Sequence, residues 1–494
     1  MSLNKRRNGI LLHISSLASN YGIGSLGEEA FKFIDFLKET KQAYWQVLPI
    51  CQPSLSNCPY SAYSSYAGNP LFIDLDLLKD DGLLNKEDYD QLNWGNNINK
   101  VDFELVSKNK EIVLKKAVNN YKKDDDYYKF EKDNSFWLKD YALFMTLKEI
   151  YNCPWYELPL ELKLKDEDAI NNFIKEYQDL IDKYSIIQYF FFKQWYKLKE
   201  YANNNGIEII GDIHIYVSYD SAEVYNHLEL FDLNEDYQPT IVSGCPPDGF
   251  TSEGQKWNNP LYKWENHEKN NYKWWISRII YLCNIYDVLR IDHFRAFESY
   301  FAIPIDKSAK EGYWIKGPGM KLFNELNKNK NDLSLIAEDL GFLTDDVRQL
   351  LKDTGYPGMK VLEFGFNVDN PYDEVYKPHT FEENVVGYIG THDNETLMGY
   401  LNGLRDDEKA YIMSYLQIDN PDDIFDSFIE SLLLSKANTT ILQAQDLLRL
   451  DNDSRMNTPS TIEGNWLFRI TKDIYDEKVK DKLINWMIKS NRCT

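Results

Sequence analysis

The chain has 494 residues, of which 78 are Asp or Glu and 55 are Lys or Arg, so its formal net charge is −23 at pH 7. Such a charge repels phosphate backbones and anionic lipids, which argues against nucleic acid and membranes as partners. The six cysteines are irregularly spaced and form no C-x-x-C pair. We therefore expect reduced thiols, a cytoplasmic protein and no bound metal.

Two patterns near the N-terminus imitate familiar motifs. The basic residues 5–7 and the apolar residues 9–12 resemble a secretion signal, but His13 and the following serines interrupt the apolar stretch too early. Residues 22–27 match the dinucleotide fingerprint G-x-G-x-x-G, yet Glu28 would occupy the helix start at which a pyrophosphate must bind. We expect neither export nor a bound cofactor.

Further along the chain, short apolar runs alternate with longer amphipathic stretches, which predicts a parallel α/β barrel. Residues 44–49 and 207–212 are predicted strands. Between them, residues 77–205 are dense in charged residues, Asn and Tyr with helical periodicity, which predicts a mostly helical insertion subdomain because the segment is too long for a loop. Residues 218–271 predict a second, loop-rich insertion that covers the barrel mouth.

Three apolar runs, 288–292, 333–338 and 385–393, each end in a carboxylate: Asp292, Glu338 and Asp393. Catalytic groups in barrels lie where such strands end. Acidic residues also occur at strand ends simply because the chain turns there. The repetition favours a shared site, and the neighbouring residues support it. Two arginines and a histidine flank Asp292 and should hold it ionised, and His392 precedes Asp393. After Asp393 we expect the last helices and no appended β-sandwich.

The segments around these carboxylates resemble the motifs of a known family. Arg290-Ile-Asp-His-Phe-Arg295, Ala337-Glu-Asp-Leu-Gly341 and Gly390-Thr-His-Asp-Asn394 are similar to the nucleophile, acid/base and third-carboxylate motifs of the amylomaltases, the 4-α-glucanotransferases also called disproportionating enzymes. Further similar segments are 9–17, 21–24, 44–49, 58–60, 67–70, 210–212, 221–222, 246–248, 259–262, 455–457 and 464–466, together with Gln255 and Trp257.

The resemblance implies one elaborated (β/α)8 TIM barrel over residues 1–494, with no cofactor and no metal. Retaining transfer requires a nucleophilic carboxylate and a protonated carboxyl on opposite sides of the anomeric carbon. By resemblance Asp292 is the nucleophile, Glu338 the acid/base with a raised pKa, and Asp393 the group that stabilises the transition state. The expected substrate contacts are Tyr60, Asp212, Asp248, Phe250, Gln255, Trp257, Arg290, His293 and His392.

Aromatic residues make up 15% of the chain, and sugar rings stack on aromatic faces while their hydroxyls bind polar groups. Most such rings belong to the core, but Phe250 and Trp257 lie in a segment rich in Pro and Gly, where an exposed ring suggests a ligand. The chain departs from the family pattern in three places, none of them at the three carboxylates. Gly249 replaces a tyrosine, which leaves acceptor preference open, His214 replaces a proline, and Asn57-Cys58 replaces Asp-Ser.

The expected function is that of a 4-α-glucanotransferase that acts on α-1,4-glucans and maltooligosaccharides. It would release glucose from short donors and use glucose as an acceptor. A hydrolase would use the same carboxylates and differ only in whether water or sugar attacks second. A non-catalytic glucan-binding protein would keep the aromatic groove but would not need the acid/base. The sequence leaves open the acceptor range, the oligomeric state, the extent of cyclisation and the glucan source.

Overall fold

The computed structural model describes residues 2–54, 56–247, 252–369 and 371–493. Eight parallel strands form a barrel, in the order β10-β11-β12-β1-β2-β3-β6-β9. Between the first and last strands of this order, the N–H of Ala337 donates to the carbonyl of Pro357 at 2.9 Å. The predicted (β/α)8 barrel is confirmed. The strands are β1 Arg7–Leu11, β2 Tyr44–Gln46, β3 Glu208–Ile213, β6 Val288–Ile291, β9 Leu335–Ala337, β10 Gly358–Val361, β11 Val385–Tyr388 and β12 Thr439–Gln443.

The barrel strands are short and almost wholly buried, as parallel strands covered on both faces must be. Each of the five apolar runs singled out in the sequence overlaps one of them. One expectation was wrong, because a strand and not only helices follows Asp393. The strand β12 escaped notice because Thr and Gln occupy three of its five positions. Two of these polar side chains are hydrogen-bonded: the hydroxyl of Thr440 donates to Oδ1 of Asn8 at 2.7 Å, and Nε2 of Gln443 donates to the carbonyl of Glu395 at 3.1 Å.

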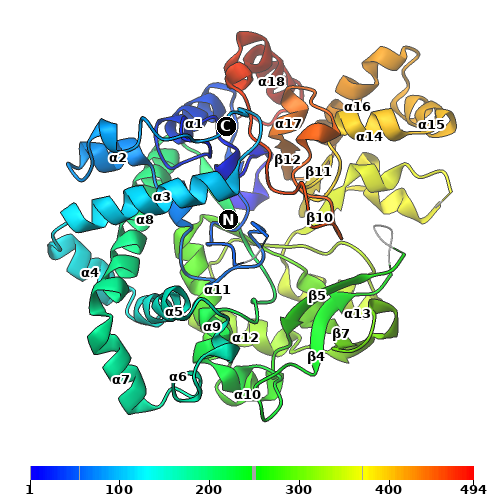
Figure 1. Ribbon diagram of the computed structural model, residues 1–494. Coiled ribbons are helices and arrows are strands. Elements are labelled where there is room, and N and C mark those ends of the chain that lie inside the picture. Colours follow the sequence, from blue (N-terminus) through cyan, green and yellow to red (C-terminus); the bar gives the residue numbers. More distant parts are fainter. Residues whose placement is uncertain (1, 55, 248–251, 370, 494) are drawn as a thin grey trace.

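Residues 77–205 contain a group of helices that lies beside the barrel, coloured cyan to green in Figure 1. The 27-residue helix α8 packs against α3, α4 and α5 and leads back to β3. The indole of Trp195 on α8 is fully buried and donates to the carbonyl of Ile285 at 3.1 Å, which attaches the helix to the barrel. The helices are α3 Phe103–Asn120, α4 Asp125–Asp133, α5 Leu138–Tyr151, α6 Leu160–Lys163, α7 Glu167–Glu176 and α8 Gln178–Asn204.

The second segment, 218–271, contains strands as well as loops. Its strands β4 Ile241–Cys245 and β5 Gln255–Pro260 join β7 Ser299–Pro304 and β8 Tyr313–Lys316 in an antiparallel sheet of order β5-β4-β7-β8. This sheet lies on the side of the barrel away from α3–α8 (Figure 1). Because β7 and β8 come after residue 271, the sheet extends beyond the predicted segment. The buried side chains of Val242, Phe301 and Ile303 in this sheet belong to a small separate apolar cluster.

The remaining helices cover the outside of the barrel. In the described parts of the chain, no helix is long and apolar enough to cross a membrane. These helices are α1 Glu28–Glu39, α2 Leu75–Asp80, α9 Ala222–Asn226, α10 Trp264–Lys269, α11 Lys273–Ile285, α12 Met320–Asn329, α13 Asp345–Thr354, α14 Leu397–Gly403, α15 Asp406–Leu416, α16 Ile424–Leu434, α17 Ala444–Leu447 and α18 Glu477–Lys489.

Candidate active site

Arg290 links two carboxylates at the carboxyl ends of neighbouring barrel strands. Asp212 on β3 and Arg290 on β6 are register partners, and Nη1 of Arg290 lies 2.5 Å from Oδ2 of Asp212. Its Nη2 lies 3.1 Å from Oδ1 of Asp292. Burial disfavours the charged guanidinium, but Asp212 and then Asp292 raise the pKa of Arg290 well above its ordinary value. One buried cation thus holds two carboxylates in place.

Asp292 directly follows β6, and its backbone N–H donates to the carbonyl of Ile213 at 3.0 Å. Its side chain is 26% exposed. Arg290 favours the charged form, as the sequence predicted, but burial outweighs this effect, so the pKa of Asp292 lies above its ordinary value. Asp212, Glu338 and Asp393 raise it further.

Glu338 directly follows β9 and is 8% exposed. Its Oε2 accepts the N–H of His293 at 2.7 Å, and its Oε1 accepts the N–H of Leu340 at 2.7 Å. Burial raises the pKa of Glu338, although Arg290 and the two backbone N–H groups oppose the shift. The two backbone bonds fix both oxygens of the carboxyl group, and the raised pKa keeps a proton available closer to neutral pH.

Asp393 lies in the loop after β11 and is held by a segment from the C-terminal part of the chain. Nδ2 of Asn457 donates to Oδ1 of Asp393 at 2.6 Å, and Nη2 of Arg455 donates to its backbone carbonyl at 2.5 Å. Nε2 of His392 lies 3.4 Å from the same Oδ1. The position of this carboxylate is therefore set by residues more than sixty positions away.

Tyr60 connects the side of the site around Asp212 with the side around Asp393. Its hydroxyl donates to Oδ2 of Asp212 at 2.7 Å. Its ring is stacked on that of His392, with centroids 5.2 Å apart and an interplanar angle of 11°. The indole of Trp466 lies 6.0 Å from both rings. Burial lowers the pKa of His392, which favours a neutral ring in this aromatic group.

The imidazole of His293 faces the antiparallel sheet. The ring of Trp257 on β5 meets it edge to face, with centroids 5.1 Å apart. The Trp257 indole donates to Oε1 of Gln255 at 3.0 Å. Burial lowers the pKa of His293 to about 3, so the ring is neutral, and its buried Nε2 has no hydrogen-bond partner within the described residues. This atom is free to bind a substrate hydroxyl.

The structure thus joins most of the predicted residues in one network of contacts. Tyr60, Asp212, Arg290, Asp292, His293, Glu338, His392 and Asp393 are linked through the contacts given above, and Trp257 and Gln255 are attached through His293. Asp248, Gly249 and Phe250 lie outside the described residues. Within those residues, no group of three or more His, Cys, Asp or Glu side chains is placed to hold a metal ion.

Sequence reasoning did not assign three residues around Asp393 to the site. Arg455, Asn457 and Trp466 lie in segments that resemble the family, but no local pattern indicates which strand end they reach. A second omission lies near Glu338. The guanidinium of Arg295 is 3.7 Å from the Trp314 ring centroid, and it donates to the carbonyl of Phe342, whose side chain is 65% exposed. The only signal in the sequence was an aromatic residue, Phe342, four positions after Glu338 and next to Gly341.

The fold and the site together define a class of enzymes. The carboxylates have different partners and lie at the carboxyl ends of barrel strands, beside aromatic rings and a buried arginine. This arrangement is typical of a barrel enzyme that acts on glycosidic bonds. The comparisons with known proteins narrow this class to one family.

A model of the 4-alpha-glucanotransferase family, glycoside hydrolase 77, matches residues 12–474. The 4-alpha-glucanotransferase of Clostridium butyricum is 42% identical over 489 residues, which is 98% of this chain and 100% of that protein. The 4-alpha-glucanotransferase of Aquifex aeolicus is 41% identical over 96% of this chain and 97% of its own length.

The amylomaltase of Streptococcus agalactiae, solved in complex with acarbose, superposes with a TM-score of 0.96 at 40% identity and covers 99% of this chain and 100% of its own. The chain therefore belongs to the 4-α-glucanotransferase family. Its activity is that of a 4-α-glucanotransferase, as the motifs predicted.

Proposed function

We propose that the chain transfers α-1,4-glucan segments between maltooligosaccharides by a retaining double displacement in which Asp292, Glu338 and Asp393 have distinct roles. The observation that carries this assignment is the difference between their partners. Asp292 is paired with Arg290, Glu338 is held by two backbone N–H groups, and Asp393 is held by Asn457. Each carboxylate is thus fixed separately at its own strand end.

In the first half-reaction, Asp292 attacks the anomeric carbon of the donor. A bond forms between a carboxylate oxygen and C1, the bond from C1 to the leaving O4 breaks, and Glu338 gives its proton to that oxygen. The ion pair with Arg290 favours the ionised form of Asp292, which is the form that attacks. The shortened glucan leaves, and the transferred segment stays on Asp292 as an ester.

In the second half-reaction, Glu338 is ionised and acts as the base. It takes the proton from the 4-hydroxyl of an acceptor sugar, whose oxygen attacks C1 and displaces Asp292. The new bond has the same α configuration as the bond that was broken, because two inversions restore it. Free glucose is a suitable acceptor, since it carries the required 4-hydroxyl.

The surrounding side chains bind the sugar at the point of reaction. Asp393 would hold ring hydroxyls and stabilise the positive charge that develops at the ring oxygen and C1. The buried Asp212 closes the pocket, and its Oδ1 has no partner within the described residues. His293 and His392 offer neutral nitrogens to hydroxyls, and Tyr60 offers a ring face.

Transfer rather than hydrolysis requires that an acceptor sugar is bound and that water is kept from the ester. Trp257 lies against His293 on one side of the site. On the acid/base side, Arg295 stacks on the Trp314 ring and donates to the carbonyl of Phe342, whose side chain is exposed, and we infer that these two rings support the acceptor. Aromatic faces are suited to sugar rings because both combine apolar surface with a fixed shape.

The proposed cellular setting is based on the net charge of the chain and on its cysteines. A chain with a net charge of −23 is poorly suited to nucleic acid or anionic membranes. Cys51, Cys58 and Cys283 are free thiols whose pKa burial raises to about 12. Such inert thiols are typical of a reducing compartment, and we propose the cytoplasm, where glycogen, starch or maltodextrin would supply the glucan.

The test is incubation of the pure protein with maltotriose alone. We expect glucose and a ladder of longer oligomers while total reducing ends stay nearly constant, because each bond that is broken is replaced by one that is made. If reducing ends instead rise with every bond cleaved, the protein is a hydrolase. If the maltotriose is unchanged and still binds, the protein is a non-catalytic glucan-binding protein.

A further inference from the structure

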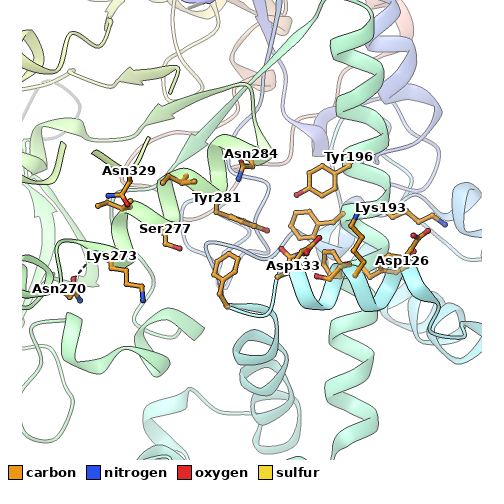
Figure 2. A pocket seen from close by; sticks show the side chains of 18 of the residues that line it. Asp126, Asp133, Lys193, Tyr196, Asn270, Lys273, Ser277, Tyr281, Asn284 and Asn329 are labelled. Carbon is orange, nitrogen blue, oxygen red and sulfur yellow. Dashed lines mark hydrogen bonds between the residues drawn. The ribbon is translucent and has the colours of Figure 1, made fainter. Parts of the chain in front are cut away.

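A large cleft lies between the helical insertion and the outer helices of the barrel. It has a volume of about 1090 Å³ and is lined by residues of α4 and α8 on one side and of α11 and α12 on the other (Figure 2). None of the residues assigned to the active site lines it. A pocket for a small ligand usually has a volume of roughly 300 to 1,000 Å³, so this cleft has room for a chain of several sugar units.

Aromatic rings occupy both walls of the cleft. Tyr281 on α11 and Tyr196 on α8 lie across from each other in Figure 2. Tyr196 is 42% exposed and Phe136 is 49% exposed, whereas Tyr281 is buried. Phe136 packs edge to face on Tyr281 with ring centroids 5.6 Å apart, so part of its ring is supported and the rest is available. Supported, partly exposed rings of this kind are the surface on which a sugar ring can stack.

The polar lining is electrically balanced. The acids Asp126, Asp133 and Glu325 are matched in number by the lysines Lys129, Lys193 and Lys273. The whole chain, in contrast, has a net charge of −23. A site for an anion or a cation would carry an excess of the opposite sign. The balance therefore favours an uncharged ligand.

The other polar groups of the lining are amides and hydroxyls. Five asparagines and Ser277 line the cleft, and each can both donate and accept hydrogen bonds. Within the described residues, neither the hydroxyl of Tyr196 nor the side-chain amide of Asn271 has a hydrogen-bond partner, so both are available to a ligand. Neutral groups that donate and accept, combined with aromatic faces, match the alternating hydroxyls and apolar faces of a sugar chain.

We propose that this cleft is a second, non-catalytic binding site for a neutral α-glucan chain. The proposal rests on the proposed function for the identity of the sugar, but not for the existence of the site. A glucan that is long enough to bind here while another part reaches the active site would be retained by the enzyme between turnovers. A short substrate such as maltotriose would gain nothing from it. The site would thus raise the apparent affinity for polymers and leave the chemistry unchanged.

Binding stoichiometry is the first test. Isothermal titration of the Asp292→Asn variant with maltoheptaose should show two sites per chain. Adding Phe136→Ala and Tyr196→Ala should leave one. Tyr128→Ala is the matched control, because Tyr128 is a 54% exposed tyrosine of α4 that does not line the cleft. This control should keep both sites. A single site in the Asp292→Asn parent, or two sites in the cleft variant, would overturn the proposal.

Kinetics in the otherwise unchanged enzyme is the second test. The Phe136→Ala, Tyr196→Ala variant should disproportionate maltotriose at the parental rate, while its KM for amylose rises about threefold to tenfold. Equal KM values for amylose would contradict the role of the cleft. Tyr196→Ala alone serves if the double variant is unstable, because the Tyr196 ring packs on one ring, that of Phe192, whereas Phe136 packs on two, those of Tyr66 and Tyr281. A parent without transfer activity on maltotriose, but with a titration site that Tyr196→Ala removes, would contradict the proposed function and support the cleft.

Discussion

The backbone N–H of His293 donates a hydrogen bond of 2.7 Å to Oε2 of Glu338. His293 directly follows Asp292, so one residue connects the proposed nucleophile to the proposed acid/base. Its φ of 48° is left-handed, a conformation that costs a non-glycine residue about 1 kcal/mol or more. The surrounding structure maintains this conformation, and as a result the two carboxyl groups are positioned by the backbone.

The first prediction separates the roles of these two carboxyl groups. Asp292→Asn should abolish transfer, because no nucleophile remains, while the fold and glucan binding persist. Glu338→Gln should fail on maltooligosaccharides but still react with an α-glucosyl fluoride, whose leaving group needs little protonation. Mass spectrometry of the trapped Glu338→Gln variant should find the glucosyl ester on Asp292. A label on any other residue would mean that the nucleophile is misassigned.

The second prediction concerns the pH profile of kcat/KM. Burial raises the pKa of both Asp292 and Glu338, and activity requires the first ionised and the second protonated. Activity should therefore fall on acidification at a pH above the ordinary range for Asp, and fall again at alkaline pH as Glu338 loses its proton. With a glucosyl fluoride as donor, formation of the ester in Glu338→Gln should lose the alkaline decline. If that decline persists, another group is responsible for it.

The third prediction tests the support of Asp393. Asn457→Ala removes the 2.6 Å hydrogen bond to Oδ1 of Asp393, so the carboxylate should lose its fixed position. We expect kcat/KM to fall about tenfold to a hundredfold, mainly through kcat, with little change in the melting temperature. Asn457→Asp should be worse than Asn457→Ala, because it places a second negative charge against Asp393. Equal effects of the two changes would argue that Asn457 only fills space.

The fourth prediction concerns water. Trp257→Ala removes the ring that packs on His293 and should open the site, so that more of the glucosyl ester is hydrolysed. Total reducing ends should then rise during incubation with maltotriose. Tyr313→Ala is the control, because Tyr313 is exposed on β8, at the other edge of the same sheet. If hydrolysis rises equally in both variants, loosening of the sheet and not the Trp257 ring is the cause.

The fifth prediction concerns stability and a buried acid outside the catalytic group. Asp446 is buried, its Oδ1 accepts the N–H of Leu397 at 2.8 Å, and burial raises its pKa to about 7. An acid whose pKa is raised by folding binds its proton more tightly in the folded state, so it destabilises the fold progressively as the pH rises from about 4 to 7. Asp446→Asn keeps the acceptor oxygen and avoids the charge.

Asp446→Asn should therefore raise the melting temperature more at pH 8 than at pH 5, and the difference should correspond to on the order of 1 to 3 kcal/mol. Burial raises the pKa of the nearby Glu363, and the charge of Asp446 raises it further. The two acids therefore repel each other, and the gain should shrink in a Glu363→Gln background. An equal gain at both pH values would show that the effect of the substitution is on packing and not on charge.

Local patterns in the sequence predicted the barrel class and the family, which are confirmed, and proposed the three carboxylates, because apolar runs that end in acids and the short motifs around them lie within single stretches of chain. The sequence did not reveal β12, because three of the five residues of this strand are polar, and the partner of one of them, Asn8 for Thr440, lies at the other end of the chain. It also predicted that cations keep Asp292 charged, and did not anticipate that burial outweighs Arg290.

The packing of whole elements brings distant residues to the proposed site. Asn457 reaches Asp393, Tyr60 bridges Asp212 and His392, and Trp257 reaches His293 from a separate sheet. The cleft between α8 and α11 belongs to the same category, because its two walls come from segments that the chain brings together only on folding. Local patterns record the preferences of neighbouring residues, whereas these contacts depend on how whole elements pack, and no short stretch of sequence contains that information.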